Sequence, residues 1–451
     1  MSKHASSTKY SFSRVLPRVV LSTVLIGSSV PKFSSAAGLD KTTAYAQGQS
    51  VSGGGYQRLA NKDAQVHIDI WVDGTAGDDN SAGDEQHPLR TLDEAIKKAG
   101  ATAAQHKTIG IKGTYALTHT VSIPEGVTLF VAASGATIQG TGNTIDGLIL
   151  QNGATLTGAG TLTMTGFKTA LTAKEGSLIT DGTYVFKNNG QEDGCGISLQ
   201  GKVHGSTGKD KLTITADDIC DTDFYTDSVV FENCTVSVTS QTRTWFDARN
   251  LTLKNACLSV AGFGMSYYVN NLTMENSEFT INKRGWRHAT GLTIQGSSTI
   301  KDSTITANAG STAGISVGAQ DKEINIINST LVFNNGGTGG LNVNTGKVVL
   351  NDSTIKGNGK NSGALFGAQE NGSIEFLGNC LVETPAATNA DTGAGVQNHY
   401  IVKGGSYALT YAPNYHASMG STIPVNGAEN GNEQLSLFTL ADSSVRMPSS
   451  A

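Results

Sequence analysis

Apolar and polar positions alternate along much of this chain in a unit that recurs every 21–26 residues. Seven ten-residue copies align, such as "STIKDSTITA" (298–307), and they start at residues 229, 251, 272, 298, 324, 348 and 374. Their third and eighth positions are always apolar, and their fifth is Asn or Asp except at Gly378. Alternation over such short runs is typical of half-buried strands, so each copy predicts two short strands around a polar turn.

A further short strand is predicted between copies, where Gly precedes three mostly apolar residues. These segments are "GLTI" (291–294), "GISV" (314–317), "GLNV" (340–343), "GALF" (363–366) and an earlier "GISL" (196–199). Upstream, a looser pattern recurs in "EGVTL" (125–129), "NGATL" (152–156) and "EGSLI" (175–179).

A unit of this length with two or three short strands cannot bury its inward side chains alone, so successive units must stack. The leucine pattern of leucine-rich repeats is missing, and propeller blades need about 40 residues or more. The fold class predicted is therefore all-β, a right-handed parallel β-helix. We expect the third and eighth positions to face inward. The fifth position should form a ladder, because a side-chain amide can bond the same group in neighbouring coils.

A short capping helix is predicted at the N-terminal end of the stack. Thr91 and Glu94 have the spacing of a capping box, and the apolar face would comprise Leu92, Ala95, Ile96 and Ala99. Such a helix would protect the first strand edge from pairing with another chain.

The stretch "IDIWVDGTAGDDNSAGDEQHPLRTLDEAIKKA" (68–99) resembles the N-terminal start of pectate-lyase-like β-helix proteins of bacterial surfaces. The resemblance extends over roughly 65–410 and implies the same fold. It implies little about activity, because this fold includes lyases, hydrolases and adhesins. Of the motifs of the related hydrolases, only Asp-Asp occurs, at 78–79 and 217–218, and the arginine motif of pectate lyases is missing.

The N-terminus reads as a signal for export. Lys3, Lys9, Arg14 and Arg18 precede the apolar run "VVLSTVLIGSSV" (19–30), with cleavage expected after Ala36 or Ala46 and an uncleaved anchor as the alternative. We expect a secreted or cell-surface bacterial protein. The predicted regions are a signal peptide and flexible N-terminus (1–46), a linker (47–65), the cap (66–101), the β-helix (102–400) and a C-terminal cover or tail (401–451).

Composition and charge narrow the classes of partner that the chain is expected to bind. A net charge of −5 offers no basic excess for nucleic acid, and the mature chain has no predicted membrane span. The cysteines number five, so at least one is unpaired within the chain. Cys234, Cys257 and Cys380 fall in the repeat where other copies carry small residues, so we expect buried packing.

Unusual residues concentrate between 217 and 288, where aromatic, basic and acidic side chains occupy neighbouring coils. Aromatic rings stack on sugar faces, and Arg or Lys neutralises uronates. The candidate catalytic residues are Asp247, Arg243, Arg287 and His288, and the candidate substrate-binding residues are Trp245, Tyr267, Tyr268, Lys283, Arg284 and Trp286. We expect no cofactor, or calcium held by Asp217, Asp218, Asp221 and Asp223.

Simpler readings stand beside these. Trp245 and Trp286 fit the core, the basic cluster fits a solvated face, and 217–227 fits a solvated loop or part of a sugar cleft. The functional hypothesis is a monomeric adhesin-like protein that binds a polysaccharide or host-surface glycan. The alternative is a polysaccharide lyase or glycoside hydrolase acting on a uronic-acid glycan through this cluster.

Overall fold

The computed structural model describes residues 66–446, apart from 101, 103, 191–195, 219–221, 241–243, 264–266, 285–290, 309–313, 335–338, 359–363, 378–379, 384–399, 404–405, 411–437 and 442–443. It describes the backbone but not the side chains of 218, 222–227, 240, 244–247, 263, 283–284, 339, 357–358, 364–371, 376 and the described residues beyond 380.

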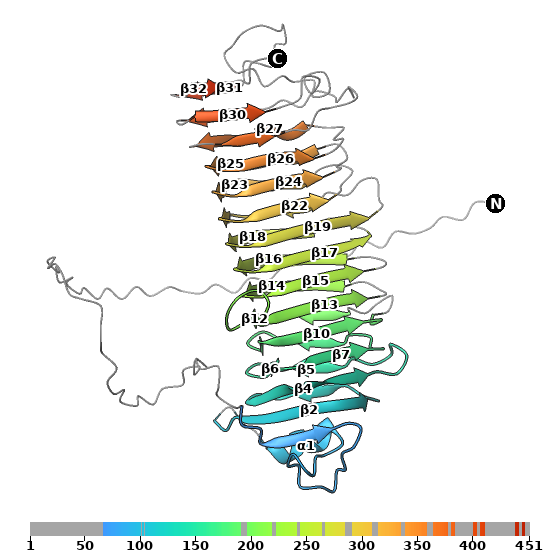
Figure 1. Ribbon diagram of the computed structural model, residues 1–451. Coiled ribbons are helices and arrows are strands. Elements are labelled where there is room, and N and C mark those ends of the chain that lie inside the picture. The colour runs from blue at the N-terminus through green and yellow to red at the C-terminus, as the bar shows by residue number, and fades with distance from the viewer. Residues whose placement is uncertain are drawn as a thin grey trace, which may run out of the picture. The chain divides into compact units, whose positions relative to one another are not determined.

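The described chain is a stack of coils in which each strand pairs in parallel with strands of the neighbouring coils (Figure 1). Phe231, Leu253 and Met274 are register partners in three successive coils, as are Val236, Leu258 and Phe279. These side chains are buried, as are the third and eighth positions of the next three copies. The predicted all-β parallel β-helix is confirmed.

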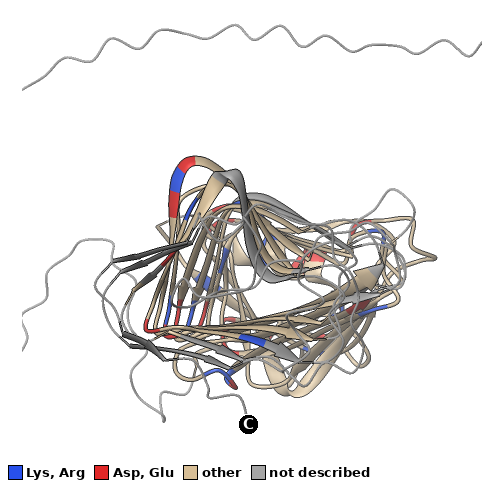
Figure 2. Cartoon of the chain, turned by 90° about the horizontal axis from the view of Figure 1, so that it is seen from above, with Lys and Arg blue, Asp and Glu red and all other residues tan. Residues whose placement is uncertain are grey.

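Each coil contributes segments to three faces, seen end-on in Figure 2. Face 1 contains β1 (Ile70–Asp73), β6 (Thr155–Gly158), β9 (Leu178–Ile179), β12 (Lys202–His204), β21 (Ser298–Lys301), β29 (Tyr400–Lys403) and β31 (Phe438–Ala441). Face 2 contains β7 (Thr161–Thr165), β10 (Gly182–Lys187), β13 (Leu212–Asp218), β15 (Thr235–Ser240), β17 (Cys257–Phe263), β19 (Glu278–Arg284), β22 (Thr304–Asn308), β24 (Thr330–Asn334), β26 (Thr354–Asn358), β28 (Leu381–Glu383), β30 (Ser406–Thr410) and β32 (Ser444–Arg446).

Face 3 contains β3 (Val121–Ile123), β5 (Leu148–Leu150), β8 (Leu171–Ala173), β11 (Ile197–Leu199) and β20 (Leu292–Ile294). Longer strands run from face 3 into face 1: β14 (Thr222–Glu232), β16 (Thr244–Lys254), β18 (Tyr267–Glu275), β23 (Ile315–Ile327), β25 (Gly339–Asn351) and β27 (Ala364–Leu377). In β2 (Lys107–Ala116) and β4 (Val127–Gln139) the strand runs from face 1 into face 2. Parallel pairing continues beyond the boundary at 400 that the sequence predicted, into β32.

The fifth position of the repeat forms the predicted ladder at the corner between faces 1 and 2. Asn255 donates to Asn233 at 2.8 Å, Asn276 donates to Asn255 at 3.1 Å, and Asn328 donates to Asp302 at 2.6 Å. All of these residues have positive φ, between 45° and 52°. Asn and Asp tolerate this left-handed conformation better than other non-glycine residues, which explains their recurrence at the turn.

The sixth position forms a second ladder that the sequence did not predict. Ser277, Ser303, Ser329 and Ser353 are buried, and each hydroxyl accepts the N–H of the equivalent residue one coil earlier at 3.1 Å. Each hydroxyl also donates to a carbonyl two residues before it, as Ser303 does to Lys301 at 2.6 Å. These bonds satisfy backbone N–H groups that would otherwise be buried without a partner.

The seventh copy differs from the ungapped sequence alignment. Leu381 pairs with Thr354 and Val382 with Ile355, so the structural equivalent of the eighth position is Val382 rather than Leu381. Cys380 therefore occupies the sixth, buried position, and one extra residue lies at this corner. That insertion explains why the fifth position of the alignment reads Gly378.

The cap matches the prediction in outline. Helix α1 (Leu92–Ala99) packs against β1 and β2 at the N-terminal end of the stack, with Leu92, Ala95 and Ala99 buried (Figure 1). The Thr91 hydroxyl accepts the N–H of Glu94 at 3.3 Å. The return bond of a capping box is not made by Glu94, which instead pairs with Lys97; Asp79 accepts the N–H of Thr91 at 2.8 Å.

Candidate functional site

The described candidate residues between 217 and 284 border one corner of the coil stack, where the chain leaves face 2 and enters face 3. Asp217 and Asp218 end β13, and Lys283 and Arg284 end β19, both on face 2. Asp223, Trp245, Asp247 and Tyr268 lie at the start of strands on face 3. The structure thus places a dispersed set of sequence positions along one edge.

Register on face 3 brings four candidates onto adjacent strands. Asp223 on β14 pairs with Trp245 on β16, and Asp247 on β16 pairs with Tyr268 on β18. Neighbouring strands lie about 4.8 Å apart. Tyr268 is 37% exposed, which is the largest exposed fraction of any Phe, Tyr or Trp among the described side chains. An acid and an aromatic residue are therefore register partners twice across the three neighbouring strands β14, β16 and β18.

Tyr267 does not belong to this surface. Its side chain is 1% exposed and lies in the core. Side chains alternate along β18, so Tyr267 points inward, Tyr268 outward and Val269 inward. Its assignment as a substrate-binding residue is corrected. Asn270 and Asn271 are both exposed, so the alternation resets where face 3 turns into face 1.

Face 2 separates the acidic candidates from the basic ones. Asp217 pairs with Thr239, which pairs with Ala261, which pairs with Asn282 beside Lys283. Three strand spacings amount to about 14 Å. Asp217 is exposed, and the side chains of Asp218, Lys283 and Arg284 are not described. The acids at 217–218 are therefore too far along the axis to pair directly with the bases at 283–284.

Arg243, Trp286, Arg287 and His288 lie outside the described residues, as does Asp221 of the calcium hypothesis. Their roles remain predictions from the sequence. Among the described side chains, no three His, Cys, Asp or Glu residues gather as a metal site would require.

A charged row on face 1 was not singled out in the sequence. His204, Glu232, Lys254, Glu275 and Lys301 are consecutive register partners on β12, β14, β16, β18 and β21. Nδ1 of His204 lies 2.8 Å from Oε2 of Glu232, and Nζ of Lys202 lies 3.3 Å from the same oxygen. Burial opposes ionisation, but His204 and Lys202 outweigh it and hold the pKa of Glu232 below its usual range. The alternation of base and acid at spacings of 28, 22, 21 and 26 residues, close to the repeat length, could have identified this row.

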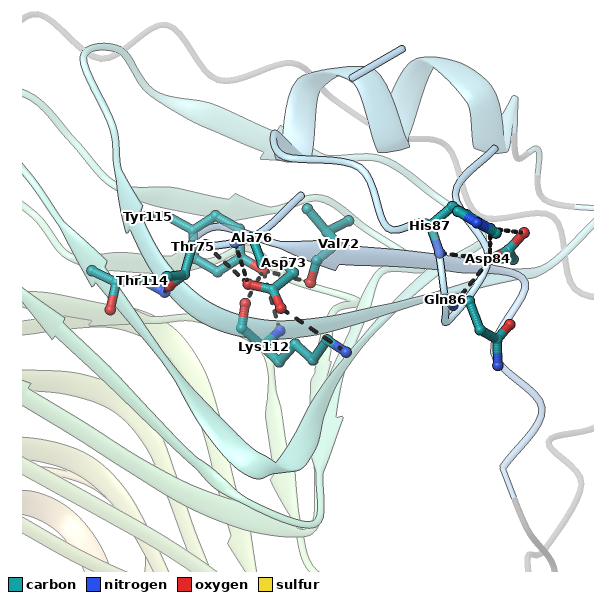
Figure 3. Close-up of polar contacts among 10 residues, drawn as sticks. All are labelled: Val72, Asp73, Thr75, Ala76, Asp84, Gln86, His87, Lys112, Thr114 and Tyr115. Atoms are coloured by element: carbon teal, nitrogen blue, oxygen red, sulfur yellow. Dashed lines mark hydrogen bonds and ion pairs between the residues drawn. The ribbon is translucent and has the colours of Figure 1, made fainter. Parts of the chain in front are cut away.

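The second polar network surrounds the cap and is drawn in Figure 3. Asp73 accepts the N–H groups of Thr75 and Ala76 at 2.9 and 3.0 Å, and Asp84 accepts the N–H of His87 at 2.7 Å. The buried hydroxyl of Tyr115 lies 2.8 Å from the Val72 carbonyl, and burial raises the pKa of Tyr115 above its ordinary value. These polar groups bond one another, so we interpret the network as structural support for the cap.

The free thiols divide by position in the repeat. Cys234 and Cys380 are buried as expected, whereas Cys257 is only partly buried because it occupies the seventh, outward position beside Thr235. Burial raises the pKa of Cys234 to about 12 and also raises that of Cys257. A raised pKa argues against either as an activated nucleophile.

Within the described residues, none of the helical structure has the length and apolarity needed to cross a bilayer. No family model matches this chain, and neither a curated protein nor a solved structure does so. The fold and the geometry of the face 2 to face 3 corner are therefore the grounds for a functional assignment.

Proposed function

We propose that this protein is an exported bacterial β-helix protein that binds carbohydrate without transforming it, in an adhesin-like manner. The observation that supports this proposal most directly is the exposure of Tyr268, whose register partner on the adjacent strand β16 is Asp247. An aromatic ring offers a sugar an apolar surface for stacking, and a neighbouring carboxylate accepts hydrogen bonds from sugar hydroxyls.

The row that continues from Tyr268 is consistent with binding rather than catalysis. Thr293, Ser316 and Asn342 follow it in register on successive strands of face 3, and of these Thr293 and Asn342 are partly exposed whereas Ser316 is buried and accepts from Asn344 at 2.9 Å. Hydroxyl and amide groups exchange hydrogen bonds with sugars but do not abstract a carbon-bound proton at neutral pH. Thr293 and Asn342 therefore fit an extended contact better than a single reaction centre.

The alternative is a lyase or hydrolase acting on a uronic-acid glycan. It would use Asp247 with Arg243, Arg287 and His288, as the sequence cluster suggests. Asp223 and Asp247 lie on adjacent strands two register positions apart, and a hydrolase would need these two acids as its carboxylate pair. This reading requires product formation, which separates it from binding.

The test is affinity electrophoresis of the full chain in gels containing hydroxyethyl cellulose, glucomannan or polygalacturonate. Solutions of the same polymers are monitored for absorbance of unsaturated sugar ends and for new reducing ends. We expect retardation by at least one polymer without product, and roughly tenfold weaker binding for Tyr268→Ala. Thr273→Ala, an exposed change on face 1 of the same strand, is the control and should bind normally.

Two results would overturn the proposal. Product from any polymer would establish the enzymatic alternative. The wild-type chain migrating unretarded in every gel would remove carbohydrate binding. Export is tested separately by N-terminal mass analysis of secreted protein, with cleavage expected after Ala36 or Ala46.

A further inference from the structure

Face 2 carries an outward surface of hydroxyl and amide groups arranged in register. Thr304, Thr330 and Thr354 form one row on β22, β24 and β26. Thr306 lies two positions along β22, and Asn308 and Asn334 form a row at the ends of β22 and β24. Their inward neighbours Ile305 and Leu331 are buried, so alternation directs the polar residues outward.

The threonine hydroxyls on this surface are available to a ligand. Within the described part of the chain, those of Thr304, Thr306 and Thr330 make no hydrogen bond. The buried serine ladder one residue earlier differs in this respect, since the hydroxyls of Ser303 and Ser329 each both accept and donate a hydrogen bond. The repeat thus satisfies its inward hydroxyls and leaves its outward ones free.

The amide row has spare donors as well. Asn308 donates to Asn282 at 2.7 Å, and Asn334 donates to Asn308 at 2.6 Å. Each bond runs along the coil axis and uses one of the two N–H groups of its amide. The bonds fix the orientation of the amides, so the remaining N–H groups are ordered before any ligand arrives, which lowers the entropy cost of binding.

Charge distinguishes this surface from face 1. The outward positions of β22 and β24 are Thr304, Thr306, Asn308, Thr330, Val332 and Asn334, none of which is charged. The uncharged surface ends at β26, where Lys356 is the register partner of Val332. Glu278 on the preceding strand β19 is paired with Lys209 at 3.6 Å. Face 1 by contrast presents its row of acids and bases. An uncharged surface gives a polyanion no electrostatic advantage.

We propose that face 2 at β22 and β24 binds an extended, uncharged polysaccharide whose units follow the coil axis. Strands recur every 4.8 Å or so, close to the advance of one sugar unit in an extended chain. Each of these two rungs can thus offer a threonine hydroxyl and an amide to successive sugars. This inference rests on the proposed function in taking carbohydrate as the ligand, and it adds the class of polymer and a second contact surface.

The test uses the full chain and hydroxyethyl cellulose as the uncharged probe, with polygalacturonate as the charged one. Thr304→Val/Thr330→Val removes two hydroxyls while preserving shape and strand propensity. The matched control is Thr273→Val/Thr299→Val, an equivalent register pair on face 1. We expect about tenfold weaker binding of hydroxyethyl cellulose by the face 2 variant, from two lost hydrogen bonds, and no change in the control. Binding should be the same at low and high salt.

The outcomes separate the two proposals. If Tyr268→Ala weakens binding but the face 2 variant does not, the inference is wrong and the proposed function stands. Salt-dependent binding of polygalacturonate alone, or equal loss in both double variants, also overturns the inference. If the wild-type chain binds neither these probes nor glucomannan, the proposed function falls and the inference falls with it.

Discussion

Asn255 donates its side-chain amide to Oδ1 of Asn233 in the preceding coil, at 2.8 Å, and accepts from Asn276 in the next coil at 3.1 Å. Its φ of 45° places it in the left-handed region. One residue therefore turns the backbone and joins three coils through its side chain.

Replacing Asn255 separates these two roles. We expect Asn255→Ala to lower the free energy of unfolding by about 2–3 kcal/mol, from backbone strain and lost side-chain bonds. Asn255→Gly should cost about 1 kcal/mol, because glycine removes the strain but not the lost bonds. Urea denaturation followed by circular dichroism measures both. Asn325→Ala, an outward position on β23 without positive φ, is the control, and an equal loss there would contradict the ladder argument.

The serine ladder gives a second stability test. Ser303→Ala leaves the buried N–H of Ser277 without its acceptor, which should cost about 1–3 kcal/mol of unfolding free energy. Ser237→Ala, on the outward side of β15, should change the same quantity by less than about 0.5 kcal/mol. Hydrogen exchange of the Ser277 amide should accelerate in the first variant. Unchanged protection of that amide would show that the hydroxyl does not hold it.

Lys347 joins two acids in neighbouring coils. Its Nζ lies 2.5 Å from Glu375 and 3.3 Å from Glu323, and hydrogen bonding to Glu375 raises the pKa of Lys347. A raised pKa means that this stabilisation is complete below about pH 10.5, the ordinary value, and is lost as pH rises through the higher folded value. Unfolding midpoints measured across the alkaline range should show the wild type losing stability there.

Removing the lysine tests the same pair by mutation. Lys347→Met leaves the buried carboxylate of Glu375 without its cation, and we expect a loss of about 2 kcal/mol, moderated by the partial exposure of the lysine. Lys347→Met/Glu375→Met should recover most of that loss. Failure of the double variant to recover would indicate that the lysine acts through packing rather than charge.

Thiol reactivity should follow burial. With a pKa of about 12, Cys234 holds about a thousandfold less thiolate than an ordinary thiol near neutral pH. We expect iodoacetamide to modify partly buried Cys257 well before Cys234 or Cys380, as resolved by peptide mass spectrometry. All three should react at similar rates in urea. Rapid modification of Cys234 in the folded chain would contradict its placement in the core.

Much of the fold was predictable because the chain repeats one pattern. The inward third and eighth positions, the Asn ladder and helix α1 each follow from residue type and spacing. The one-residue insertion before Cys380 could not be predicted in this way, because the apolar residues align nearly as well in either register. The serine ladder was missed because a buried hydroxyl and an exposed one look alike in sequence.

The candidate site was predictable only in part. Tyr267 and Tyr268 are adjacent and alike, and their orientations depend on the reset at Asn270 and Asn271. Register placed Asp247 beside Tyr268 and kept the acids at 217–218 away from Lys283. Arg243 and His288 lie outside the described residues, so their roles stay predictions.

The side-chain amides of the ladders share one direction. Asn255, Asn271, Asn308, Asn328 and Asn334 all donate to the coil before them, and each ladder serine accepts from the coil before it. From Asn233 onward, each ladder residue therefore finds its polar partner already in place on the coil before it. A chain that emerges N-terminus first can fold by templated addition, one coil at a time, without waiting for its C-terminal end.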